Sequence, residues 1–255
     1  MSDTVSLIAL PAMPRIRPGD DLAKLLAAAI ERQASELAAG DILVVAQKIV
    51  SKAEGRYVDL ARVEPGPEAR RLAGETEKDP RLVQVILDES RRVVRHRPGV
   101  LIVEHRLGFV MANAGVDRSN IDPEASAEPV LLLPRDPDAS AAALRERLGR
   151  HFGRQPAVVV SDSFGRAWRR GTAGIALGAA GLPALVDLRG RPDLYGRRLR
   201  VTEIGFADEI AAAASLLMGQ ADEAVPAVLL RGLSWSAPDT PAGTLIRTAE
   251  EDLFR

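Results

Sequence analysis

The 255-residue sequence contains no cysteine, which excludes disulfide bonds, thiolate metal sites and a cysteine nucleophile. Histidine is also scarce. The three that occur, His96, His105 and His151, share no metal-ligand spacing, and each lies beside arginine. We therefore interpret all three as solvated surface residues, and a zinc hydrolase is disfavoured.

The sequence also lacks an excess of charge of one sign and lacks long hydrophobic runs. Its formal net charge is -1, so it has no global basic field for nucleic acid, and we expect no nucleic-acid partner. No apolar run approaches the roughly 18 residues of a membrane span, and residues 1–10 show no signal-peptide pattern. A cytoplasmic protein with no membrane association is the expectation.

The common nucleotide-binding motifs are absent as well. Neither the P-loop pattern G-x-x-x-x-G-K-[ST] nor the Rossmann pattern G-x-G-x-x-G occurs. If a nucleotide binds, its pocket must be built from several separate loops.

Hydrophobic periodicity predicts alternating strands and helices without strict βαβ regularity. We expect a mixed α/β (α+β) fold, with parallel and antiparallel strands in one sheet and two intimately packed subdomains. Residues 1–235 are expected to form one functional unit, followed by a loosely packed tail over 236–255. Strands are predicted over 5–10, 42–46, 100–104, 109–112, 130–133, 157–160, 185–188 and 227–230, and helices from 22 to about 38, over about 67–96 with a break near Asp79-Pro80, and over 136–152 and 207–218.

Two acidic motifs could carry chemistry, and both are expected in loops. Ser161-Asp162-Ser163 follows a buried strand and offers a carboxylate beside hydroxyls, a combination suited to Mg²⁺ or Mn²⁺. The arginines just after it could bind phosphate. Asp117-Arg118-Ser119-Asn120 offers a second carboxylate and further hydrogen-bonding groups. A helix cap and an Asx-turn, respectively, are the purely structural alternatives.

Two further segments are candidates for the same site. Residues 47–55 are polar and basic, and they contain Lys48 and Lys52, which could neutralise phosphate charge. A solvated basic loop is the alternative. The Met218–Glu223 segment follows a predicted helix end and could point polar groups into a cleft, although it could equally be a plain C-cap and turn.

In order along the chain, these segments resemble one family, the coenzyme F420:L-glutamate ligases, which add glutamate to a deazaflavin coenzyme. The likeness rests on Gly40–Arg56, Asn113–Asn120, Ser161–Arg169 and Leu216–Glu223, within about residues 5–232. It implies a mixed α/β fold of two subdomains, a homodimer, and GTP, L-glutamate and the deazaflavin precursor as substrates. It also implies Mg²⁺ or Mn²⁺, with two ions per subunit, and K⁺ as an additional ion.

The resemblance also implies roles for individual residues. Asp117, Asp162, Ser163 and Gln220 fall on metal-binding positions, and Asp117, Asp162 and Lys52 on catalytic ones. The GTP-contacting positions are Met13, Pro14, Arg15, Ile16, Gln47, Lys52, Asn120, Met218, Gly219, Gln220, Ala221, Asp222, Glu223, Ala224 and Val225.

The implied reaction runs through an acyl phosphate. The acceptor carboxylate attacks the γ-phosphate of GTP, and the glutamate amine then displaces phosphate, leaving GDP and a γ-glutamyl-type amide. Two alternatives remain open: a ligase of the same fold that uses another carboxylate acceptor, and a nucleotide-binding dimer without turnover.

Overall fold

The computed structural model describes residues 4–34, 36–121 and 126–253 and confirms a mixed α/β fold. A five-stranded central sheet has the strand order β1-β12-β2-β8-β9. Only β2 and β8 are parallel; the other neighbours are antiparallel. Its strands are β1 (Ser6–Ala9), β2 (Ile42–Ala46), β8 (Ala157–Arg166), β9 (Arg169–Ala180) and β12 (Ala227–Arg231).

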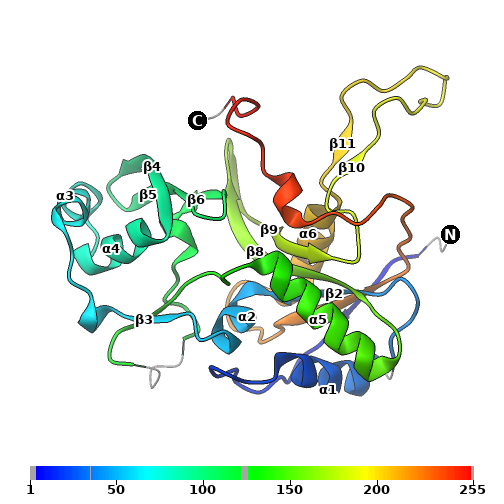
Figure 1. The fold of residues 1–255 in the computed structure, drawn as a ribbon, viewed down its shortest axis with the longest axis horizontal. Coiled ribbons are helices and arrows are strands. Elements are labelled where there is room, and N and C mark those ends of the chain that lie inside the picture. Colours follow the sequence, from blue (N-terminus) through cyan, green and yellow to red (C-terminus); the bar gives the residue numbers. More distant parts are fainter. Residues whose placement is uncertain (1–3, 35, 122–125, 254–255) are drawn as a thin grey trace.

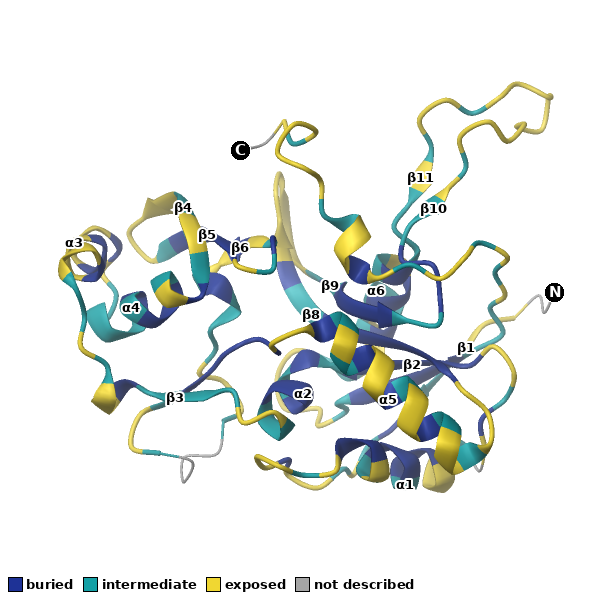
Figure 2. Cartoon of the chain, viewed as in Figure 1, coloured by how far each residue is buried: buried dark blue, intermediate teal, exposed yellow. Residues whose placement is uncertain are grey.

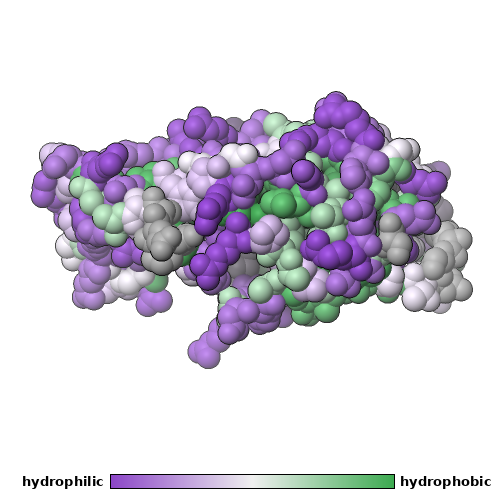
Figure 3. Space-filling view, turned by 90° about the horizontal axis from the view of Figure 1, so that it is seen from below, coloured by the Kyte–Doolittle hydropathy of each residue, from purple (hydrophilic) through white to green (hydrophobic). Residues whose placement is uncertain are grey.

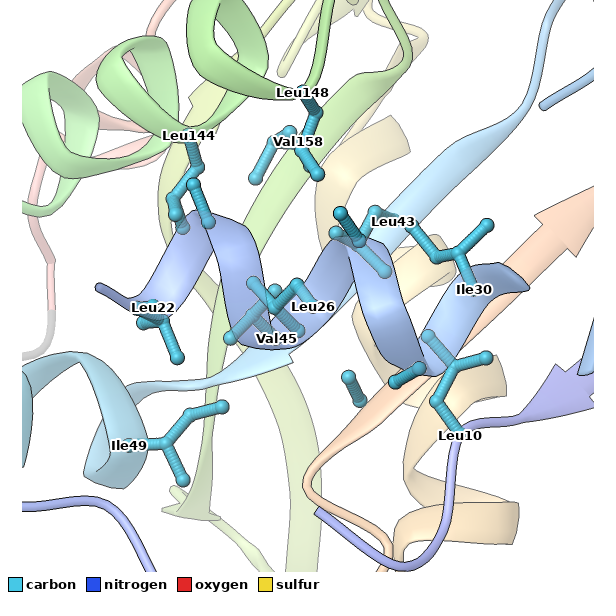
Figure 4. Close-up of a cluster of buried hydrophobic side chains, with 14 of the residues drawn as sticks. Leu10, Leu22, Leu26, Ile30, Leu43, Val45, Ile49, Leu144, Leu148 and Val158 are labelled. Carbon is cyan, nitrogen blue, oxygen red and sulfur yellow. The ribbon is translucent and has the colours of Figure 1, made fainter. Parts of the chain in front are cut away.

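Helices cover both faces of the central sheet (Figure 1). One face packs against α1 (Leu22–Ala34) and α5 (Pro137–Phe152), and the other against α6 (Phe206–Met218). The alternation of strand side chains divides β2 between the two cores, with Leu43 and Val45 on the first face and Ile42 and Val44 on the second. Figure 4 shows Leu43 and Val45 among the leucines of α1 and α5. Burial on both faces explains the continuous apolar run of this strand.

A small lobe, residues 56–133, lies beside the central sheet (Figure 1). It contains a two-stranded sheet, a three-stranded sheet and two helices packed on them. Phe164 of β8 joins the lobe to the central sheet, since its ring meets that of Phe109 edge-on at 6.0 Å. The lobe elements are β3 (Tyr57–Asp59), α3 (Pro67–Thr76), α4 (Pro80–Asp88), β4 (Ser90–Arg97), β5 (Val100–His105), β6 (Val110–Ala112) and β7 (Pro129–Leu131).

Helix ends largely follow the caps that the sequence offers. Asp136 caps α5, its side chain accepting a hydrogen bond from the Ala139 N–H at 3.0 Å, and Gly153 ends that helix in the left-handed region. Asp79 caps α4 ahead of Pro80, where the helical pattern was expected to break. Helix α6 ends at Gly219 as predicted.

The structure differs from the predicted elements in several places. Helix α1 was expected to reach about residue 38, but it ends at Ala34. The helical region was expected to run to residue 96, but α4 ends at Asp88 and residues 90–97 form β4, which pairs with β5 across the turn at Gly99. Residues 47–53 form the helix α2 (Gln47–Ala53) rather than a basic loop. The glycine-rich stretch after residue 164 forms much of β9, a strand that was not predicted.

The segment after residue 235 contacts the body of the protein at two points. The backbone N–H of Ala184 donates to Thr240 Oγ1 at 2.9 Å, and Ala242 is completely buried at the start of a short 3₁₀ helix, η3 (Ala242–Leu245). Two short strands, β10 (Val186–Asp187) and β11 (Glu203–Ile204), instead support the most exposed segment, which we call the arm (residues 188–202). The arm projects from the body, and most of its residues are exposed (Figure 2).

The molecule is elongated, and hydrophilic residues cover much of the face seen from below, with hydrophobic residues gathered toward the middle and right (Figure 3). None of the described helices is long and apolar enough to cross a membrane.

An ionic cluster around the buried Glu89 lies within the small lobe, and it contradicts one prediction. His105 is only 2% exposed, not a solvated surface residue, because β5 places it against Glu89 at the end of α4. Arg56 donates to Glu89 Oε2 at 3.0 Å, and Arg106 pairs with the other carboxylate oxygen. Burial alone would raise the pKa of Glu89, but His105, Arg106 and Arg56 together lower it to about 2.

This cluster predicts acid sensitivity. A carboxyl group whose folded-state pKa is depressed stabilises the fold above its unfolded pKa, and that contribution is lost as pH falls from about 4.5 to about 2. Glu89→Gln should therefore cost about 3 kcal/mol at pH 7, and the difference from wild type should disappear near pH 2. Thermal unfolding across this range measures it, with Glu75→Gln at a more exposed ion pair as control. A pH-independent difference would contradict the assignment.

Candidate active site

Four strands of the central sheet bring polar segments to one edge, the one formed by the ends of the strands where β2 and β8 finish. Strands β2 and β8 run parallel, with Ala46 opposite Ser161, so α2 begins beside the Ser161–Ser163 segment. Strand β12 is antiparallel to β2, and the segment that precedes Ala227 therefore reaches the same edge. Strand β1 is antiparallel to β12, so the chain after Ala9 leaves the sheet there too. Ligands of open α/β sheets bind at such a strand-end crevice.

A pocket with a cavity volume of 530 Å³ lies at this edge, and we call it the site pocket. The lobe contributes one wall. The central sheet, α2, the chain after β1 and the end of α6 with the segment that follows it contribute the others. Its lining residues are Met13, Pro14, Arg15, Ala46, Gln47, Lys48, Ile49, Lys52, Asp117, Ser119, Asn120, Ser161, Asp162, Ser163, Gly174, Ser215 and Met218–Pro226.

Asp162 lies within β8 rather than in a loop after it, which corrects the sequence prediction, because the strand continues to Arg166. A register shift between Val160 and Ser161 leaves Leu177 unpaired on β9. Such a bulge locally redirects side chains. The Ser163 N–H donates to Asp162 Oδ1 at 2.8 Å. Burial raises the pKa of Asp162 to about 6, only partly opposed by that hydrogen bond and the charge of Lys48.

Asp117 faces the pocket from the small lobe and pairs with a lysine from α2. Lys48 Nζ lies 2.7 Å from Asp117 Oδ2 and donates to Ser119 Oγ at 2.8 Å. The N–H of Ser119 donates to Asp117 Oδ1 at 2.7 Å. Burial alone would raise the pKa of Asp117, but the hydrogen bonds from Lys48 and Ser119 lower it, so Asp117 is a carboxylate at neutral pH. The Asx-turn and the site are thus one structure rather than alternatives.

Lys52 and Asn120 connect three sides of the pocket. Lys52 lies one helical turn after Lys48, so both lysines project from the same side of α2. Its Nζ donates to the Asn120 carbonyl at 2.6 Å, and the Asn120 amide donates to the carbonyl of Ala221 at 3.0 Å. The small lobe, α2 and the segment after α6 are therefore held together around the cavity.

The segment after α6 forms a compact rim. Gly219 has a φ of 68° and a ψ of -172°, a backbone conformation that is essentially restricted to glycine, so glycine is required there. The Glu223 carboxylate accepts a hydrogen bond from the Ala221 N–H at 2.8 Å, and such backbone hydrogen bonds lower the pKa of Glu223. Gln220 and Asp222 are left exposed at the mouth of the pocket.

The segments that line the pocket fall within one match to a known protein family. A sequence model of the F420-0:gamma-glutamyl ligase family matches residues 12–232, a range that includes every element lining the pocket. The chain belongs to this family.

Curated relatives resemble the chain over nearly its whole length. The coenzyme F420:L-glutamate ligase of Methanothermobacter thermautotrophicus is 47% identical over 253 residues, which is 98% of this chain and 99% of that protein. The enzyme of the same name from Methanopyrus kandleri is 46% identical, over 99% and 98% of the two chains. That of Archaeoglobus fulgidus is 41% identical, over 98% and 96%.

The structure brings together nearly all of the residues that the family resemblance indicated. The exception is Ile16, which lies in the core beneath α1 and does not line the pocket. Lys48 and Ser119 lie in segments that the sequence marked as candidates, although the family resemblance implied no individual role for either residue. Reading residues 47–53 as a helix would have placed Lys48 beside Lys52. No sequence signal marked Gly174, which reaches the pocket through the β8–β9 pairing. Residues 122 and 123, predicted as part of the Asp117 loop, lie outside the described residues.

The donor set of the pocket fits a hard divalent cation. Asp117 and Asp162 are carboxylates from opposite walls, and Ser163 and Gln220 add neutral oxygen atoms. Asp162 is a half-buried carboxyl whose only hydrogen-bond donor among the described residues is the neighbouring Ser163 N–H, so its negative charge is poorly compensated. No group of three or more His, Cys, Asp or Glu side chains converges as a metal site in the described ranges. Mg²⁺ and Mn²⁺ suit this arrangement, since they accept a few carboxylates together with water and phosphate oxygens.

Proposed function

We propose that this protein is a GTP-dependent, GDP-forming ligase that joins L-glutamate to the carboxylate of a deazaflavin coenzyme F420 precursor through an acyl phosphate. The observation that carries this proposal is the meeting of Asp117 and Asp162, from separate parts of the fold, in one pocket with Lys48 and Lys52. Family membership, with relatives named coenzyme F420:L-glutamate ligase, supports the choice of substrates.

The proposed reaction explains why a phosphate-handling pocket is needed. A carboxylate is a poor electrophile, so one of its oxygen atoms first attacks the γ-phosphorus of GTP, and the bond to the bridging oxygen breaks to release GDP. The glutamate nitrogen then attacks the acyl carbon and loses a proton as phosphate leaves. Positioning and charge compensation supply most of the catalysis of phosphoryl transfer.

The residues of the chain divide this work. Asp117, Asp162, Ser163 and Gln220 would hold Mg²⁺ or Mn²⁺, which when bound would neutralise phosphate charge. Lys48 and Lys52 add positive charge from one side of α2. When phosphate binds, Lys48 can leave its ion pair with Asp117 and contact a phosphate oxygen instead. The segment from Met13 to Arg15, together with Gln47, Asn120 and the rim from Met218 to Val225, would bind the nucleotide. K⁺ as an accessory ion and assembly as a homodimer belong to the same proposal.

Acceptor-dependent release of GDP tests the proposal. With Mn²⁺, GTP, L-glutamate and the deazaflavin precursor, we expect GDP at a rate that falls to background when either the precursor or glutamate is omitted, and ATP should replace GTP poorly. GDP release with a different carboxylate acceptor, but not with the deazaflavin, would indicate a related ligase. GTP binding without acceptor-dependent release would indicate a binding protein and contradict the proposal.

A further inference from the structure

The β8–β9 hairpin extends beyond the site pocket and ends in an exposed basic and aromatic tip. Ser163 and Gly174 are paired across the hairpin, and both line the pocket. From there the two strands continue to the pair Arg166–Arg169, and we call residues 165–172 the hairpin tip. We propose that the hairpin tip is the acceptor-binding element, in which Trp168 stacks on a planar aromatic ring and Arg169 and Arg170 bind an anionic tail. This inference rests on the proposed function.

The charge of the tip supports an anionic ligand. Arg166, Arg169 and Arg170 are all exposed, and none of them forms an ion pair with a carboxylate in the part of the chain that the structure describes. Arg166 Nη2 donates instead to the carbonyl of Arg170 at 3.4 Å, which holds the turn closed. The whole chain has a net charge of -1, so the positive charge of the tip is local and does not reflect an overall basic protein. Exposed guanidinium groups that form no ion pair within the described residues are suited to bind the carboxylate or phosphate of a ligand.

Trp168 gives the tip an aromatic surface. Its side chain is 88% exposed, an unusual position for the largest hydrophobic residue. Its φ is 64°, in the left-handed region where a bulky residue is disfavoured and glycine would fit without strain. Such a residue at the apex of a turn adds little to the core, whereas an exposed indole beside arginines is a surface on which a planar ring can stack.

The distance from the pocket matches the shape of the proposed acceptor. Arg166 lies three positions after Ser163 in β8, and an extended strand spans about 10 Å over three residue steps. The acceptor carboxylate must react in the pocket beside Asp162, while the deazaflavin ring lies at the opposite end of the molecule. A ring bound at Trp168, with its tail between the arginines and the pocket, would place the carboxylate where GTP is activated.

The arm provides a matched comparison. It also carries an exposed aromatic residue, Tyr195 (96% exposed), and several arginines, including Arg197. However, the arm joins the body next to the start of α6 at Phe206, whereas the pocket lies at the other end of that helix, beside Met218. Thirteen helical residues span about 20 Å. The arm of the same molecule is therefore farther from the pocket than the hairpin tip, and substitutions there control for general effects of removing exposed rings and charges.

Steady-state kinetics test the inference. Trp168→Ala should raise the KM for the deazaflavin acceptor about tenfold, while the KM for GTP stays at its wild-type value. Arg169→Gln with Arg170→Gln should also raise the acceptor KM and weaken its dependence on salt. Tyr195→Ala and Arg197→Gln should change neither constant. An unchanged acceptor KM in both tip variants of an active enzyme would overturn the inference and leave the proposed function standing.

A fluorescence measurement decides the same point without turnover. Trp168 and Trp235 are the only tryptophans, so Trp235→Phe leaves the tip indole as the single reporter. Titration of this variant with the deazaflavin acceptor should quench indole emission saturably, at concentrations close to the acceptor KM. Acceptor binding without quenching would overturn the inference. Quenching without any GTP-dependent product would support the tip as a deazaflavin site while contradicting the proposed ligase activity, so the two failures are distinguishable.

Discussion

Asp162→Asn is expected to lower GTP-dependent ligation by about a thousandfold or more, the size of effect seen when a principal charge-compensating group is lost from phosphoryl transfer. Asparagine keeps the shape of the side chain and can still accept the hydrogen bond from the Ser163 N–H. It removes only the negative charge, which the account assigns to holding Mg²⁺ or Mn²⁺. The loss should therefore appear in turnover and in the dependence on metal concentration.

The same substitution should increase the stability of the protein in metal-free buffer. Burial raises the pKa of Asp162 to about 6 from an ordinary value of 3.8, so the fold disfavours the charged form. At pH 7 the ionised carboxylate destabilises the folded state, and a neutral side chain relieves up to about 3 kcal/mol. The benefit should shrink as pH falls through 6, because wild-type Asp162 then becomes neutral.

Two measurements test these effects: turnover as a function of metal concentration, and thermal unfolding of protein from which metal has been removed with a chelator. Asp208→Asn is a matched control, because burial also raises the pKa of Asp208, opposed by a hydrogen bond from the Ala176 N–H at 2.8 Å, but Asp208 does not line the pocket. That variant should retain activity. A stable Asp162→Asn protein with normal turnover and normal metal dependence would show that Asp162 does not hold the metal.

Arg231→Ala is expected to destabilise the protein by about 3–5 kcal/mol, because it leaves a buried carboxylate without its counter-charge. Asp41 is completely buried at the start of β2, and Arg231 of β12 donates to both of its oxygens, at 2.8 and 2.7 Å. The Ala38 N–H also donates to Asp41, at 2.8 Å. This pair fixes the central strands at the end opposite the site pocket.

Denaturant unfolding at neutral pH measures the cost. Arg147→Ala is the matched control: Arg147 forms an ion pair with Asp21 in which both side chains are about 45% exposed, and its loss should cost less than about 1 kcal/mol. Combining Asp41→Asn with Arg231→Met removes both charges and should recover part of the stability. If Arg231→Ala and Arg147→Ala lower the free energy of unfolding equally, the buried ion pair contributes no more to stability than a surface ion pair.

The sequence predicted the elements that bury a continuous or clearly periodic apolar face. Strands β2 and β12 and helices α5 and α6 are close to their predicted ranges, because their apolar patterns and caps agree with each other. Strand β4 was predicted as helix, since Val93 and Val94 continue the apolar pattern of α4 while the turn at Gly99 and pairing with β5 decide the structure. Strand β9 has few β-branched residues, and its small side chains fit where α5 and α6 approach closely. A Cβ at Gly178, for example, would lie 2.1 Å from the Pro137 carbonyl oxygen.

The site was predictable as a set of motifs but not as a geometry. The order of four motifs indicated the family, whose match was then found over residues 12–232. The pairing of Lys48 with Asp117 depends on two segments about 70 residues apart that meet only when the small lobe docks on α2. Similarly, only the continuation of β8 to Arg166 shows that Asp162 and the exposed Trp168 belong to one hairpin. Neither relation leaves a local pattern in the sequence.

Mass spectrometry of the products formed from GTP, L-glutamate and the deazaflavin precursor tests the central claim most directly. We expect an acceptor whose mass has increased by that of a glutamate residue, joined through the glutamate nitrogen to the acceptor carboxyl group, with GDP and phosphate formed in equal amounts and no product from the Asp162→Asn variant. Hydrolysis of GTP with an unchanged acceptor, or glutamate attached to the acceptor equally well by that variant, would contradict it.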